Sequence, residues 1–84
     1  MSVFVDTSAF ISLLVAEDQN HQRAAATWRD LVARDELLVT TNYVAVETCS
    51  ILHKRFGSTA LRKLVGGALS VVSVEFVDLE THTA

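Results

Sequence analysis

Apolar and polar positions along this chain form blocks that predict a repeated order of one strand followed by two helices. A short apolar strand comes first, at residues 3–5. The helix after it, at about residues 9–15, carries apolar residues nearly all round, which predicts burial. A polar run at residues 17–20 ends that helix, and its last residue, an asparagine, caps a second helix at about residues 21–34. Apolar side chains recur in this helix at helical spacing, and Trp28 is predicted to lie in the core.

The second half of the chain repeats the pattern and ends in a third strand. A short strand at residues 37–40 precedes a helix at residues 43–56, with Asn42 as its cap and Gly57 as its end. A further helix follows at residues 59–69, weakened by two glycines near its end, each costing about 1 kcal/mol relative to alanine. β-Branched residues fill the last segment, residues 71–77, as is usual for a buried parallel strand. This alternation predicts an α/β fold with a parallel sheet.

A single carboxylate closes the first predicted strand. Asp6 stands at the mouth of that strand, and ligands of open parallel sheets bind outside the carboxyl ends of the strands. Asp6 is therefore a candidate for chemistry, although it could equally be a helix cap. Thr7 or Ser8 could fill the capping position as well, and capping is the favoured role for Ser8 over contact with a metal-bound water. A phosphoacceptor role of the receiver-domain type is disfavoured, because residues 2–5 bring no further acid.

A second acid, Glu47, stands alone among apolar and small neighbours in the helix that follows Asn42. An ionised carboxylate against apolar side chains is costly unless a cation or several donors compensate, so the sequence implies a partner such as a metal ion or an arginine. The positive end of the helix offers part of that compensation, which leaves a purely structural role open.

Two segments, FVDTSAF near the N-terminus and TTNYVAVETCSIL further along, resemble the opening motifs of PIN domains, most closely those of VapC-type toxins. The resemblance implies a Rossmann-like α/β/α fold of three layers around a parallel sheet. It also implies a metal-dependent ribonuclease, the toxin of a type II toxin–antitoxin pair, with RNA as substrate and a cognate antitoxin protein as partner. By the same match, Asp6 and Glu47 are the first two acids of the family site, both catalytic and metal-binding. The implied cofactor is Mg²⁺ or Mn²⁺, which hard oxygen ligands suit.

The later acids of that family pattern have no counterpart in these 84 residues. We therefore expect a single PIN-like domain, residues 1–84, that lacks its C-terminal elements. A two-metal site needs more carboxylates than Asp6 and Glu47 supply, so an alternative is a catalytically inactive remnant that binds an antitoxin or self-associates. Later strands of the resembled fold cover the first strand, and their loss would leave an open apolar edge at residues 3–5. Such an edge predicts a homo-oligomer or pairing with a second fragment.

Composition and charge indicate the class of protein and the cellular compartment. The chain is 50% hydrophobic and 20% charged, as expected for one folded domain with a marginal core. Cys49 is the only cysteine, which excludes an internal disulfide and favours a reducing compartment. No leader or spanning segment is visible, so a cytoplasmic location is expected. The net charge of -3 counts mildly against nucleic-acid binding, although bound divalent cations would reverse the local field.

Several other polar residues are weaker candidates for function. Asp78 and Glu80 could replace absent metal ligands, but acids near a chain end are ordinarily solvated. The basic residues 53–55 and 62–63 could contact RNA phosphates, but cations near a helix C-terminus are favourable without any ligand. His21 and His82 are isolated, with no neighbours at metal-ligand spacing.

Overall fold

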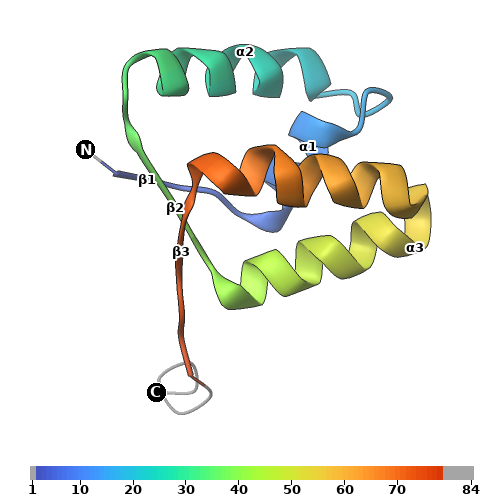
Figure 1. The fold of residues 1–84 in the computed structure, drawn as a ribbon. Coiled ribbons are helices and arrows are strands. Elements are labelled where there is room, and N and C mark those ends of the chain that lie inside the picture. The colour runs from blue at the N-terminus through green and yellow to red at the C-terminus, as the bar shows by residue number, and fades with distance from the viewer. Residues whose placement is uncertain (1, 79–84) are drawn as a thin grey trace.

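The computed structural model describes residues 2–78, which form a parallel sheet with helices beside it (Figure 1). The elements in chain order are β1 (Ser2–Phe4), α1 (Thr7–Leu14), α2 (His21–Ala33), β2 (Leu37–Thr41), α3 (Asn42–Gly66), the 3₁₀ helix η1 (Ala68–Val71) and β3 (Ser73–Glu75). The predicted order of strands and helices is confirmed, and with it the α/β class. Among the described residues, no helix combines the length and the apolar character that crossing a membrane requires.

The predicted glycine boundary inside the second half is confirmed at Gly57. Its φ of 82° and ψ of -171° interrupt the hydrogen-bonded helix, so α3 consists of two arms that meet there. The cap of the first arm differs from the prediction, because the Thr41 side chain accepts the hydrogen bond from the Val44 amide. Asn42 instead holds the chain after β3: its Nδ2 donates to the Val77 carbonyl (3.3 Å), and its Oδ1 accepts from the Val77 amide (2.8 Å).

The last helix and the last strand are both shorter than predicted. The second arm of α3 ends at Gly66, and a 3₁₀ turn occupies residues that the sequence had assigned to the helix and the strand. The strand β3 keeps only Ser73–Glu75, because its neighbour β2 ends at Thr41, the partner of Glu75. Beyond that point no strand remains for the backbone of residues 76–78 to pair with within the described part of the chain.

The helices gather on one face of the sheet. The strand order is β1-β2-β3 and both pairings are parallel. Both crossovers therefore move in the same direction across the sheet, and because such crossovers are right-handed, they place α1, α2 and α3 on the same side. Figure 1 shows the three helices together beside the strands.

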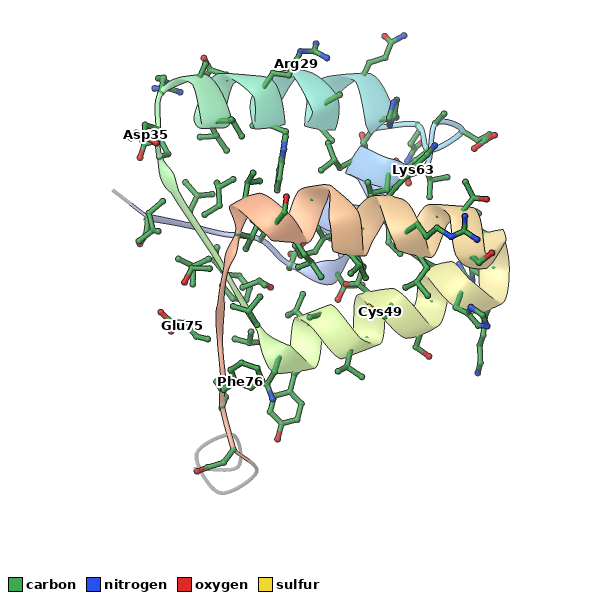
Figure 2. All side chains as sticks on the ribbon, in the orientation of Figure 1. Arg29, Asp35, Cys49, Lys63, Glu75 and Phe76 are labelled. Atoms are coloured by element: carbon green, nitrogen blue, oxygen red, sulfur yellow. The ribbon has the colours of Figure 1, made fainter. Side chains whose placement is uncertain are left out.

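The opposite face of the sheet is uncovered within residues 2–78. Phe4 of β1 and Leu37 of β2 are each 57% exposed on this face, and Glu75 of β3 points away from the helices (Figure 2). The strand β1 is an edge strand of the described sheet, as predicted. The described residues thus contain the sheet and one helical layer of the three layers that the family resemblance implies.

The core lies between the sheet and the helices. Its buried apolar members are Val5, Phe10, Val15, Leu38, Leu52, Leu64, Ala68 and Val72. Trp28 packs against it as predicted, half-buried, with its ring centroid 6.3 Å from that of Phe10 in a tilted arrangement. The buried Thr40 hydroxyl donates to the Val5 carbonyl (2.8 Å), which ties β2 to the end of β1 just before Asp6.

Candidate active site

Asp6 stands where β1 ends and α1 begins, and it is the cap of α1. Its Oδ1 accepts hydrogen bonds from the Ala9 amide (2.9 Å) and from the Ser8 hydroxyl (3.0 Å). The favoured capping role of Ser8 was therefore wrong, because Asp6 already occupies that position. Both of these bonds go to Oδ1, and the side chain is exposed. The capping bonds of Asp6 therefore involve only one of its two carboxylate oxygens.

Glu47 lies in the second turn of α3 and is exposed, so the expectation of a carboxylate pressed against apolar side chains is wrong. The buried side of this helix carries Thr48 and Leu52 instead, and Val46 next to Glu47 is 68% exposed. The partner that the sequence implied is a neutral hydroxyl: Thr7 Oγ1 donates to Glu47 Oε1 at 2.7 Å.

Thr7 is the site residue that sequence reasoning gave only a capping role. Its hydroxyl oxygen lies 3.3 Å from the hydroxyl of the buried Thr48, which donates mainly to the Val44 carbonyl at 2.7 Å. This chain of hydroxyls joins the first turn of α1 to α3. The one sequence feature that pointed to Thr7 was its position directly after Asp6. Its partner Glu47 lies 40 residues away, and only the tertiary fold brings the two side chains together.

The two predicted acids are thereby brought to the same end of the sheet. The Glu47 carboxylate accepts a hydrogen bond from Thr7, which immediately follows Asp6 at the carboxyl end of β1. Their oxygens and the neighbouring hydroxyls form a set of hard donors, the kind that Mg²⁺ and Mn²⁺ prefer. That the two carboxylates share one ion stays a prediction.

Two open hollows flank Glu47, each of about 550 Å³. One runs along the outer side of α3. The other lies at the strand ends and is lined by Phe4, Thr41, Tyr43, Val44, Glu47 and Val77. The second hollow occupies the crevice outside the carboxyl ends of parallel strands, where ligands of such sheets bind.

The weaker candidates lie beside this place, apart from it, or outside the described residues. Asp78 is exposed just beyond β3, whereas Glu80 and His82 lie outside the described residues. No group of three or more His, Cys, Asp and Glu side chains within residues 2–78 is arranged to hold a metal ion. Lys63, from one of the two basic runs, lies on the second arm of α3, away from the strand ends (Figure 2). His21 has a structural contact, since its Nδ1 lies 2.9 Å from the Ser12 carbonyl.

Comparison with known proteins agrees with this fold and with the family resemblance. The crystal structure of VapC20 from Mycobacterium tuberculosis, a sarcin-ricin loop cleaving toxin, matches with a TM-score of 0.73 and 32% sequence identity. The match covers 95% of this chain and 59% of VapC20, so the chain spans less than two-thirds of that protein. No curated protein matches the sequence. The model of the PIN domain family matches residues 3–84, and the chain therefore belongs to the PIN domain family.

Proposed function

We propose that this chain is the front part of a metal-dependent ribonuclease, the cytoplasmic toxin of a toxin–antitoxin pair. The observation that carries the proposal is the hydrogen bond from Thr7 to Glu47, which links Glu47 to the residue that directly follows Asp6. The similarity to VapC20, a toxin that cleaves an RNA loop, supports the same reaction class and an antitoxin as partner.

The residues at the mouth of β1 fit a divalent cation. Mg²⁺ keeps several waters and is commonly held by one or two carboxylates together with substrate phosphate, so Asp6 and Glu47 would suffice as protein ligands for one ion. Such an ion would neutralise charge at the scissile phosphate and lower the pKa of the attacking water.

The chain's own residues position these ligands. Asp6 is held by the Ala9 amide at 2.9 Å, which orients its carboxylate at the helix terminus. Glu47 is held by the Thr7 hydroxyl at 2.7 Å. In the proposed reaction Asp6 would anchor the cation, and Glu47 would be its second protein ligand.

Binding of Mn²⁺ tests this assignment, with paramagnetic broadening of amide NMR signals as the measurement. Asp6→Asn keeps a good capping side chain and Glu47→Gln keeps an acceptor for Thr7, so both variants should fold while losing a ligand charge. We expect Mn²⁺ to broaden signals around Thr7 and Glu47, and each substitution to weaken that effect at least tenfold. Glu17→Gln, an exposed acid elsewhere, is the matched control.

Broadening that is indifferent to both substitutions would remove the metal site. We also expect the purified 84-residue chain to cleave RNA poorly, because a two-metal reaction needs further carboxylates. Robust Mg²⁺- or Mn²⁺-dependent cleavage by this chain, abolished in Asp6→Ala, would show instead that two acids are enough.

The uncovered face and edge of the sheet favour a second candidate, an inactive remnant that binds an antitoxin or associates with itself or a second fragment. Apolar side chains on this face, Phe4 and Leu37, are more than half exposed. Metal affinity separates the two candidates, because a remnant has no need of an ion at Asp6 and Glu47.

A further inference from the structure

Tyr43 and Glu47 share one side of α3. They are four residues apart, a spacing that brings side chains together on a helix surface. Tyr43 is 36% exposed, and it lines both of the hollows that Glu47 lines. An aromatic ring therefore borders the candidate site on the same side as its second acid.

A second aromatic ring borders the hollow at the strand ends. Phe4, 57% exposed, lines this hollow together with Tyr43 and Glu47. Val77, in the wall of this hollow, is held by two hydrogen bonds with Asn42, one donated and one accepted by the Asn42 side chain, and Asn42 directly precedes Tyr43. At about 550 Å³ the hollow falls within the usual size of small-ligand sites, about 300–1,000 Å³.

The charges around the two hollows disfavour direct phosphate binding by the protein. Their described linings contain no lysine, arginine or histidine, and Glu47 is the one ionised side chain among them. A cation would offset the repulsion between Glu47 and an RNA phosphate here. The uncharged, aromatic part of the lining suits a nucleobase, since bases stack on aromatic side chains in single-strand binding sites.

We propose that Tyr43 is a base-stacking residue that positions single-stranded RNA at the acid site, an inference that rests on the ribonuclease function proposed above. A base next to the scissile phosphate stacks on Tyr43, with Phe4 bordering the same hollow. Stacking then supplies the substrate affinity that the acidic surroundings cannot supply. The phosphate would be left to a cation held by Asp6 and Glu47.

The test is a titration of the 84-residue chain with a labelled single-stranded oligoribonucleotide in millimolar Ca²⁺, followed by fluorescence anisotropy. Stacking contributes about 1–3 kcal/mol per base, so Tyr43→Leu should weaken binding roughly 5- to 150-fold. Tyr43→Phe keeps the ring and should bind like the parent chain. Phe56→Leu removes an exposed aromatic ring near the far end of the first arm of α3 and should change nothing.

An abasic series identifies the stacked position. Removing one base at the right place should weaken binding by the parent chain but should have little added effect on Tyr43→Leu. Near-equal affinities of Tyr43→Leu, Tyr43→Phe and the parent chain would overturn the stacking assignment.

The metal variants keep the two proposals apart. If Asp6→Asn abolishes the Ca²⁺ dependence while Tyr43→Leu binds normally, the stacking role is wrong and the metal site stands. If Tyr43→Leu weakens binding while the Ca²⁺ dependence survives in Asp6→Asn, the stacking role stands and the metal site is wrong. Absence of any RNA binding by the parent chain would overturn the stacking role, whereas the Mn²⁺ titration decides the metal site independently.

Discussion

At the scale of single residues, the site depends on a short series of side-chain hydrogen bonds. Asp6 caps α1, and the next residue, Thr7, donates to Glu47 across 2.7 Å. One carboxylate is thus positioned by a backbone amide and the other by a hydroxyl. The same bonds stabilise the start of α1 and its contact with α3, so local stability and the candidate chemistry depend on the same residues.

Replacing Thr7 by valine tests this dependence. The shape is retained while the donor to Glu47 is lost, so we expect unfolding free energy to fall by about 1 kcal/mol and Mn²⁺ affinity to fall with it. Urea unfolding of the dilute chain and the NMR titration measure the two effects. Thr59→Val, at an exposed position in the second arm of α3, is the control. A Thr7→Val chain as stable as this control would show that the hydrogen bond contributes nothing.

At the scale of elements, glycines decide where the helical segments end. Gly57 has a φ of 82°, a backbone conformation that residues other than glycine rarely adopt. A Cβ at this position would meet nothing within 4 Å, so the constraint is conformational and not steric crowding by neighbours. Gly67 is constrained in another way, because a Cβ there would lie 2.6 Å from the Lys63 carbonyl oxygen. One glycine is required by backbone conformation and the other by close approach.

Three alanine substitutions separate these reasons. Gly57→Ala should cost about 1–3 kcal/mol through backbone strain, and Gly67→Ala should be destabilising through the contact with Lys63. Gly66→Ala should be neutral or stabilising by up to about 1 kcal/mol, since it is helical and has open space around it. Thermal unfolding measures all three. A neutral Gly57→Ala would contradict the left-handed conformation at the junction of the two arms.

At the scale of the whole molecule, the direction of the crossovers decides which face of the sheet the helices cover. All three helices lie on one face of the sheet, and the other face and the edge at β1 remain open within the described residues. Exposed apolar edges and faces are ordinarily blunted or covered, because unpaired backbone groups and bare side chains promote association. Neither proline nor lysine occurs in β1 to prevent this.

We therefore expect the purified chain to associate at micromolar concentration. Light scattering measures its mass, and intact mass spectrometry excludes a co-purifying fragment. Leu37→Lys, on the open face, should reduce association. Val65, in the second arm of α3, has the same 57% exposure, and Val65→Lys should leave association unchanged. A dilute, cooperatively melting monomer of the parent chain would show that the face and the edge are covered in another way.

The sequence by itself determined the order of the elements, the break at Gly57, and the two acids at the strand mouth and on the helix. These features follow from local periodicity, from glycine's backbone freedom and from motif resemblance. Tertiary structure alone decided that Thr7 bonds Glu47, that Asn42 holds Val77 while Thr41 takes the cap, and that β3 stops where β2 ends. Apart from the Thr41 cap, whose bond to the Val44 amide is local, each of these depends on partners more than 30 residues apart in the chain. The local sequence pattern cannot predict such long-range contacts, because side-chain hydrogen bonds and strand pairing form only when the helices pack on the sheet.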